Sequence, residues 1–364
     1  MNKHNTSNYA KMIAFFMIAV SLLSVLAVSA DGWQNDSLLP SEENQGSNDQ
    51  SDNTPPSNAE EDNTQKNEPI KYYHHITGKE ISENECYDTQ VAYIIDSNSP
   101  LYGINECNIL IEFPIENKNS RFVVIRDQSE NISKIGSLTY SRHYMTNLSK
   151  VFGATVVSLE NDDTISYDHI DISSFKLDLA KNKASYYTEY TYFKYTNTYL
   201  LNDAFLGLSN VKAPAANVLP YQFASNTDTK TAGIISAESI VLPYDTTTML
   251  TYSVNDKKYV LNKMGSDKID ISTPDQVGFD NVLILFADSM TYETADSTQL
   301  VMNTIGSGAG YYANGGTAQK IFWSLDINGN MSLVDESGNT LIVERGNFYI
   351  GYVKSSMINH TIFS

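Results

Sequence analysis

NILIEFPIENKNSRFVVIRD, residues 108–127, contains two of the clearest strand signals in this chain. Residues 108–114 and 121–127 are rich in isoleucine, valine and phenylalanine, and polar residues separate them. Such runs, bounded by turn residues, are typical of β-strands. Residues 91–96 (VAYIID) and 154–159 (ATVVSL) have the same character, so we expect four strands in this part of the chain.

Helical signals lie between and after these strands. Within residues 141–152, Tyr144, Leu148 and Phe152 are spaced four apart, which predicts a helix with one apolar face. We expect a second helix near residues 172–179. Strands interspersed with helices predict a mixed α/β domain over residues 70–225.

The hydrophobic pattern changes after residue 232. Short apolar runs alternate with turns that contain glycine or asparagine, and Asn328-Gly329 is the strongest of these hairpin signals. The pattern predicts an antiparallel β domain over residues 232–354. The fold class is therefore expected to be α+β, with a mixed α/β N-terminal domain followed by an antiparallel β-rich C-terminal domain. The expected runs are residues 252–261, 282–286, 299–305, 319–325, 331–334, 340–343 and 348–353.

Residues 12–30 (MIAFFMIAVSLLSVLAVSA) carry no charge and follow Lys3 and Lys11. A cationic head, an apolar stretch and a small residue at Ala30 are the parts of a secretory signal peptide. The stretch is also just long enough to cross a bilayer, so residues 1–30 are either a cleaved signal peptide or an N-terminal membrane anchor. A buried core helix is a third interpretation. Either of the first two predicts an extracytoplasmic protein, membrane-anchored or secreted.

Residues 31–69 contain ten acidic residues and a single basic one, Lys66, and they have few apolar residues. Such a segment buries too little surface to offset its conformational entropy, so we predict a disordered acidic linker. Repulsion between its charges keeps it extended, which suits a spacer between a membrane and a folded module. A binding tail is the alternative interpretation.

The whole chain has a formal net charge of −19, and residues 70–364 remain acidic. No run of lysine and arginine occurs, so nucleic acid is not an expected partner, since phosphate contacts need clustered cations. The same acidity argues against binding of anionic lipid by the folded part. We therefore expect membrane contact only through the N-terminal segment.

We expect no cofactor and no metal site. Cys86 and Cys107 could form one disulfide in an oxidising compartment or remain buried thiols, and neither lies in a zinc-type pattern. Adjacent His74 and His75 would point to opposite faces of an extended segment. His143 and His169 have no histidine or cysteine near them in sequence.

Two glycine-containing motifs are better explained as β connections than as ligand sites. Residues 306–310 (GSGAG) lack the strand–helix context of a dinucleotide-binding turn, so we expect a glycine-rich connection. Residues 326–330 (DINGN) place glycine fourth, whereas a calcium loop of the EF-hand type places it sixth, so we expect a hairpin turn.

Four charged residues form the candidate ligand-binding group. Three of them lie at or beside the ends of expected strands, where open α/β sheets gather ligand-binding groups. The two arginines could hold a carboxylate or phosphate, and the two acids could orient them or act as acid and base. A structural ion-pair network is the alternative. The residues are Asp96, Glu112, Arg121 and Arg142.

Residues 186–199 (YYTEYTYFKYTNTY) contain six tyrosines. Alternating tyrosines predict a strand with an aromatic face, and tyrosine offers a large rigid area with a polar tip for stacking on sugar or peptide. Interior packing between domains is the alternative. The candidate surface residues are Tyr187, Tyr190, Tyr192 and Tyr195.

A series of short motifs resembles the YerB-like family of bacterial lipoproteins, a two-domain family of unknown function found mainly in Gram-positive bacteria. The C-terminal match comprises residues 306–312, 314–316, Trp323 and 335–339, and a weaker ordered match runs through the N-terminal part. Several family motifs are altered here. No cysteine lies near Ala30, so a lipobox is absent and the chain resembles a divergent member.

These features predict an exported, membrane-proximal cell-envelope protein that acts as a binding or scaffold module. Its expected partner is an envelope protein or a cell-wall glycan or peptide, and no catalytic signature is present. One alternative is an envelope hydrolase or transferase that uses Asp96 or Glu112. Another is a purely structural subunit without a small-molecule site.

Overall fold

The computed structural model describes residues 70–87, 89–105, 107–116, 119–128, 130–160, 169–172, 175–207, 218–225, 235–244, 247–263, 265–267, 270–293 and 298–364. The expected signal or anchor (1–30) and the expected linker (31–69) lie outside these residues. Everything described belongs to one compact unit, Glu68–Ser364. Within the described ranges, no helix is long and apolar enough to cross a membrane.

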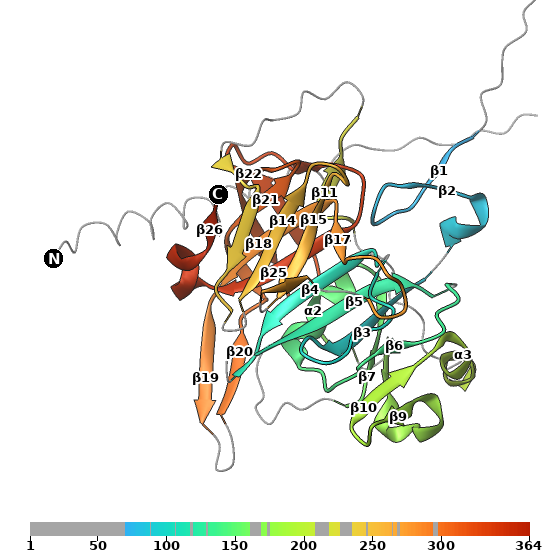
Figure 1. The fold of residues 1–364 in the computed structure, drawn as a ribbon. Helices are drawn as coiled ribbons and strands as arrows, with labels where there is room; N and C mark the ends of the chain where they lie inside the picture. Colours follow the sequence, from blue (N-terminus) through green and yellow to red (C-terminus); the bar gives the residue numbers. More distant parts are fainter. Residues whose placement is uncertain are drawn as a thin grey trace, which may run out of the picture. The chain divides into compact units, whose positions relative to one another are not determined.

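A mixed sheet of eleven described strands forms the centre of the fold (Figure 1). Its strands follow the order β12 (Ile235–Ser236), β22 (Thr317–Leu325), β21 (Gly306–Asn314), β18 (Asn281–Ala287), β25 (Phe348–Lys354), β4 (Ile109–Pro114), β5 (Ser120–Asp127), β3 (Gln90–Asp96), β7 (Ala154–Ser158) and β8 (Lys176–Asp178). Strand β23 (Met331–Asp335) pairs with β22 outside this path.

Strands from both halves of the chain are hydrogen-bonded within this sheet. β25 lies between β18 and β4 and runs parallel to both of them. β4, β5 and β3 are antiparallel neighbours, whereas β3, β7 and β8 are parallel. The segments expected as two domains therefore share one sheet, and the boundary between residues 225 and 232 stays a prediction.

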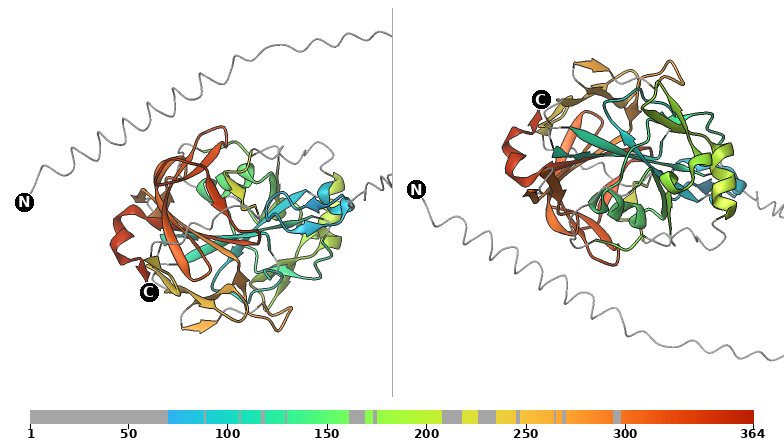
Figure 2. Two further views of the ribbon diagram at one scale, coloured as in Figure 1. Left: turned by 90° about the horizontal axis from the view of Figure 1, so that it is seen from above. Right: turned by 90° about the horizontal axis from the view of Figure 1, so that it is seen from below.

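A smaller antiparallel sheet covers one face of the central sheet. Its apolar side chains pack with those of β5, β18 and β25 in one continuous core. The other face packs against α2 (His143–Val151), and Figure 2 shows α2 (green) and the smaller sheet (yellow to orange) on opposite sides of the teal central strands. The smaller sheet contains β16 (Ser266–Asp267), β15 (Lys258–Lys263), β14 (Thr248–Ser253), β13 (Ser239–Leu242), β26 (Ile362–Phe363) and β17 (Gly278–Phe279).

The remaining described elements are short. A second α-helix, α3 (Thr198–Gly207), packs Leu201 and Ala204 into the core shared with the smaller sheet. Separate small sheets pair β1 (Tyr72–Tyr73) with β2 (Glu80–Ile81), β6 (Ile135–Gly136) and β9 (Tyr187–Glu189) with β10 (Phe193–Thr196), β11 (Tyr221–Phe223) with β24 (Leu341–Val343), and β19 (Ser289–Glu293) with β20 (Thr298–Met302). The 3₁₀ turns are η1 (Glu83–Tyr87), η4 (Leu179–Lys181), η5 (Lys183–Ser185) and η6 (Ser355–His360).

The chain is β-rich, as its strand signals predict. The four N-terminal strand predictions are confirmed by β3, β4, β5 and β7. The helix of residues 141–152 is confirmed as α2, which buries Tyr144 and Leu148, with Phe152 buried at its C-cap. The helix expected near residues 172–179 is wrong. Lys176–Asp178 instead forms β8, in which Leu177 is buried and its two neighbours are partly exposed.

The glycine-rich segment is also a correction, since Gly306–Asn314 is the nine-residue strand β21 rather than a connection. A side chain at Gly308 would begin 2.3 Å from the carbonyl oxygen of Phe286 and 2.8 Å from Trp323 Nε1. Glycine therefore allows Trp323 to cover the strand and donate its indole N–H to that carbonyl, at 3.1 Å. The expected hairpin at Asn328-Gly329 is confirmed between β22 and β23.

Candidate functional site

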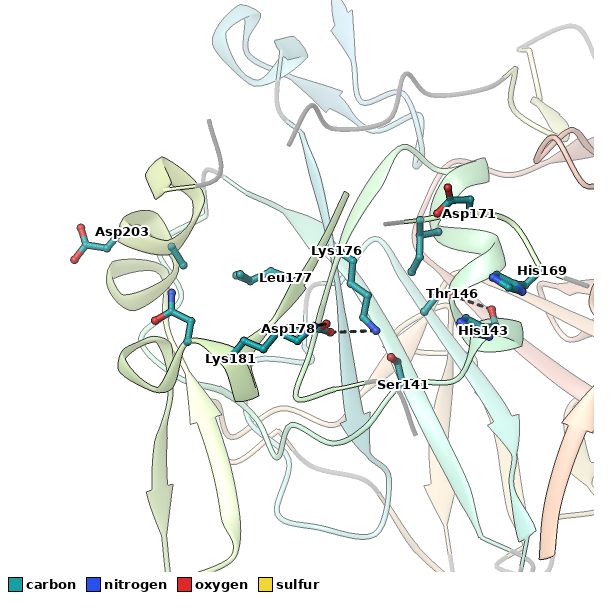
Figure 3. Close-up of a pocket in the computed structure, with 13 residues that line it drawn as sticks. Ser141, His143, Thr146, His169, Asp171, Lys176, Leu177, Asp178, Lys181 and Asp203 are labelled. Atoms are coloured by element: carbon teal, nitrogen blue, oxygen red, sulfur yellow. Dashed lines mark hydrogen bonds and ion pairs between the residues drawn. The ribbon is translucent and has the colours of Figure 1, made fainter. Parts of the chain in front are cut away.

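A cavity of about 670 Å³ opens between the N-terminus of α2, β8 and α3 (Figure 3). Cavities of this size suit small ligands. Its polar wall includes Ser141, His143, His169, Lys176, Asp178 and Lys181. We refer to these six residues and the space between them as the α2 pocket.

The α2 pocket carries charges of both signs. The rings of His143 and His169 stack with centres 3.7 Å apart and planes 6° apart. Asp178 lies 3.1 Å from Lys176 Nζ and 3.2 Å from Lys181 Nζ, so one carboxylate bridges two ammonium groups. A ligand with carboxylate, amino or amide groups would find complementary partners on this wall.

The tyrosine-rich segment next to the pocket is a β-hairpin. Strands β9 and β10 pair antiparallel, and the turn between them holds Tyr190 (φ 49°) and Thr191 (φ 70°) in the left-handed region. Tyr190, Tyr192 and Tyr199 are 77%, 62% and 76% exposed. We call these three side chains the tyrosine surface. Large aromatic groups left in water are typical of contact surfaces.

One member of the tyrosine surface, Tyr199, shares the helix α3 with two residues that line the α2 pocket. Tyr199 lies in the first turn of α3, and Asp203 and Ala204 of the same helix line the pocket. Because residues four apart share one face of a helix, Tyr199 and Asp203 are neighbours on that face. One ligand could therefore contact both the pocket wall and an exposed ring.

Two of the four predicted tyrosines do not belong to this exposed group. Tyr195 is buried, and Lys134 Nζ lies 4.1 Å from the centre of its ring. Burial raises the pKa of Tyr195 to about 12. Tyr187 is partly buried 6.0 Å from Tyr195, and Glu189 beside it pairs with Lys134 at 2.7 Å. The predicted strand is interrupted by the turn at Tyr190, so its tyrosines do not share one face: Tyr187 and Tyr195 are buried or partly buried, whereas Tyr190 and Tyr192 are exposed.

The structure does not gather the four predicted charged residues into one cleft. Asp96 and Arg121 are opposite each other on β3 and β5, whereas Glu112 is opposite Phe122. Since side chains alternate along a strand, Glu112 points to the other face of the sheet from Arg121.

Asp96 and Arg121 are engaged in local contacts. Asp96 accepts hydrogen bonds from the backbone N–H of Asn98 at 3.0 Å and the hydroxyl of Ser99 at 2.6 Å. Arg121 Nη1 donates to the carbonyl oxygen of Tyr140 at 2.8 Å. Asp96 thus stabilises the turn after β3.

Arg142 is held by an acid that the sequence analysis did not single out. Its two terminal nitrogens each donate to Glu116 at 2.6 Å, and Nη1 also donates to the carbonyl oxygen of Leu300 at 3.3 Å. Burial alone would raise the pKa of Glu116, but the hydrogen bonds and charge of Arg142 outweigh it and hold that pKa below its ordinary value. This pair supports the structural-network interpretation for Arg142.

Glu112 belongs to a fully buried polar cluster between the two sheets. Its Oε1 lies 2.5 Å from Lys263 Nζ, and both side chains are 0% exposed. Tyr349 donates its hydroxyl to Oε2 at 2.6 Å, and Ser120 donates to Oε1 at 2.5 Å. Thr248 lies 3.2 Å from both carboxylate oxygens. Glu112 therefore has no route to a substrate in this conformation.

No metal centre is found in the ranges that the structure describes. No group of three or more histidine, cysteine, aspartate or glutamate side chains there could hold an ion. Cys107 is a buried free thiol, and burial raises its pKa to about 12. The side chain of Cys86 lies outside the described residues.

Sequence reasoning missed the partners that define these sites. Lys263 and Glu116 are 151 and 26 residues away from the groups they pair with, so no local pattern indicates them. His143 and His169 were expected to stand alone, yet their rings stack because α2 and the segment before β8 meet at the pocket. A strand signal at Lys176–Asp178, with one apolar residue between two charged ones, was present but too short to recognise.

Comparisons with known proteins agree with the fold. The C-terminal domain model of DUF3048, a protein of unknown function, matches residues 240–350. The crystal structure of YerB protein from Bacillus subtilis is similar with a TM-score of 0.65 and 18% sequence identity, over 78% of this chain and 96% of that one. No curated protein matches the sequence. Both findings fit the resemblance to the YerB-like family of unknown function that the sequence motifs predict.

Proposed function

We propose that this chain is an exported, membrane-proximal cell-envelope protein that binds a cell-wall glycan or peptide without converting it. The apolar segment 12–30 and the acidic segment 31–69 support export and a spacer. The observation that carries the binding role is the tyrosine surface, whose three rings are more than half exposed.

The chemistry of this region fits wall material. Aromatic rings stack on the apolar faces of sugars, and their hydroxyl groups stay in water. The α2 pocket adds Lys176, Lys181 and Asp178, which complement the carboxylate and amino groups of a short peptide. Glycan strands with attached peptides offer both kinds of group.

Contacts of the two candidate acids favour binding over turnover. A hydrolase or transferase that used Asp96 or Glu112 would need one of them to reach a substrate. Glu112 is 0% exposed and paired with Lys263, and Asp96 accepts hydrogen bonds within its own turn.

We also propose a finer architecture in which two domains share the central sheet and depend on each other: a mixed α/β domain over residues 70–225 and an antiparallel β-rich domain over residues 232–354. The parallel pairing of β3, β7 and β8, with α2 packed on this part of the sheet, supports the first. The antiparallel ladder β18–β21–β22–β23 supports the second.

Co-sedimentation of the full chain with purified insoluble cell wall tests the binding role. Tyr190→Ala/Tyr192→Ala should weaken binding about ten-fold or more, because two stacking rings are removed. Tyr190→Phe/Tyr192→Phe keeps the rings and should bind nearly as well as the wild type.

Val254→Ala is the matched control, since Val254 is 75% exposed at another hairpin turn. It should leave binding unchanged. Failure of the wild type to sediment with wall, or equal binding by Tyr190→Ala/Tyr192→Ala, would contradict the proposal.

A further inference from the structure

The buried cluster around Glu112 and Lys263 has a feature that the binding role does not explain. An amine and a carboxyl group are held in contact, Nζ to Oε1 2.5 Å, and neither has any exposed surface. Apolar residues of the core surround them, and the ring of Phe122 lies 5.3 Å from Nζ. A buried ion pair is costly to desolvate, and the pair is relieved of charge when a proton moves from the ammonium to the carboxylate.

In neutral form, an amine is a nucleophile and a carboxyl group is an electrophile. The carboxyl carbon of Glu112 is bonded directly to the oxygen that Lys263 Nζ contacts, so the fold holds the two groups of a potential acyl transfer together without water between them. Tyr349 donates a hydrogen bond to the other oxygen, Oε2, at 2.6 Å. Burial raises the pKa of Tyr349 well above its ordinary value, so the phenol stays protonated as a donor.

Two hydroxyl groups complete a path for protons. Ser120 contacts both Lys263 Nζ and Glu112 Oε1, and Ser97 lies 3.0 Å from Nζ. These contacts connect the amine, which must lose protons, with the carboxyl oxygen that must leave as water.

We propose that Lys263 and Glu112 form an intramolecular isopeptide bond that links the two sheets. The neutral Nζ attacks the carboxyl carbon of protonated Glu112, and the hydrogen bond from Tyr349 stabilises the developing charge on Oε2. Nζ then loses a proton through Ser120 to the departing hydroxyl, so the C–O bond breaks, an amide forms and one water is released. No oxidant or further reactant is needed.

The bond would join β15 of the smaller sheet to β4 of the central sheet across 151 residues of sequence. Closing so long a loop restricts the unfolded chain strongly, as a disulfide does. An isopeptide bond also persists in any redox environment. The inference is independent of the proposed binding role.

Intact-mass spectrometry of the purified, denatured full chain tests the inference directly. The wild type should be lighter than its sequence by one water, about 18 Da. Processing of the N-terminus removes whole residues and is read separately from the N-terminal peptide. After proteolysis, the peptide containing Lys263 should be recovered linked to the peptide containing Glu112.

Variants at two lysines locate the bond. Lys263→Arg keeps a cation but cannot form this amide, so it should show the full sequence mass. Lys320→Arg is the matched control, because Lys320 lies 3.8 Å from Glu336 in an exposed pair, and it should retain the loss of water. A wild-type protein of full mass with an unlinked Lys263 peptide would overturn the inference, whether or not Lys263→Arg folds.

Discussion

Arg142 and Glu116 show how single residues stabilise this fold. The side chain of Arg142 is 4% exposed and that of Glu116 is 21% exposed, and two hydrogen bonds of 2.6 Å join them. The pair connects the loop after β4 with the start of α2, and Glu116 also accepts the backbone N–H of Leu300. Removal of either partner leaves a buried group without its counter-charge.

Glu116→Gln should lower the free energy of unfolding by about 2 kcal/mol at neutral pH, because Arg142 loses its counter-charge. The lowered pKa of Glu116 sets the pH dependence. Its stabilisation is fully present above the unfolded-state pKa, about 4.3, and is lost as the pH falls through the lower folded-state pKa.

Urea unfolding at pH 7 and at pH 3 measures this difference. The difference in the free energy of unfolding between the wild type and Glu116→Gln should be smaller at pH 3 than at pH 7. Glu336→Gln, at the exposed Lys320 pair, should change stability by less than about 0.5 kcal/mol. An equal difference in the free energy of unfolding at pH 7 and at pH 3 would contradict the stabilising role of the Glu116 charge.

A second prediction concerns a single buried carboxylate, that of Asp270, and the variant Asp270→Asn. Asp270 is 1% exposed; its Oδ2 accepts the backbone N–H groups of Ile104 and Asn105, each at 2.7 Å, and its Oδ1 accepts those of Gly103 at 3.1 Å and Ser272 at 2.9 Å. An amide has only one oxygen acceptor, so the two N–H groups at one of these oxygens lose their partner, and stability should fall by about 2 kcal/mol. Chemical denaturation measures the free energy of unfolding, and Asp256→Asn is the control because Asp256 is exposed. Equal losses of stability in Asp270→Asn and Asp256→Asn would contradict the prediction.

At the scale of elements, sequence patterns predicted those strands and the helix whose apolar spacing is continuous. They failed where a long-range contact decides the conformation. β21 tolerates glycine because Trp323 covers it, and β8 exists because it pairs with β7. The run expected over residues 252–261 is divided between β14 and β15, with a turn between them.

For the candidate site, the sequence indicated that some tyrosines of residues 186–199 are exposed, but it did not distinguish the exposed ones from the buried Tyr195. The burial of Tyr195 depends on its contacts with Lys134 and Tyr102, which are distant in sequence.

Substitutions in the β9–β10 turn should change both the stability of the protein and its binding to cell wall. Tyr190 and Thr191 have positive φ, which costs about 1–2 kcal/mol for each residue with a side chain, less for asparagine and least for glycine. Tyr190→Asn/Thr191→Gly should therefore raise the melting temperature by a few degrees and weaken binding to wall. Differential scanning calorimetry measures the first effect, and a lowered melting temperature would refute the strain argument.

The whole molecule depends on one sheet built from both halves of the chain. β25 pairs with β18 on one side and with β4 on the other, so separating the halves exposes two long apolar strand edges. Fragments 70–231 and 232–364 expressed alone should each lack a cooperative unfolding transition. Circular dichroism during heating reports this, and a sharp transition in the isolated 232–364 fragment would show that the halves fold independently.

The proposed role of the whole molecule is reversible binding of wall material at the tyrosine surface, without turnover. The most direct measurement is calorimetric titration of the full chain with soluble glycan–peptide fragments of cell wall, followed by mass analysis of the recovered fragments. We expect saturable binding that Tyr190→Ala/Tyr192→Ala weakens about ten-fold or more, with the fragments recovered unchanged. Absence of binding, or fragments cleaved or transferred during the titration, would contradict it.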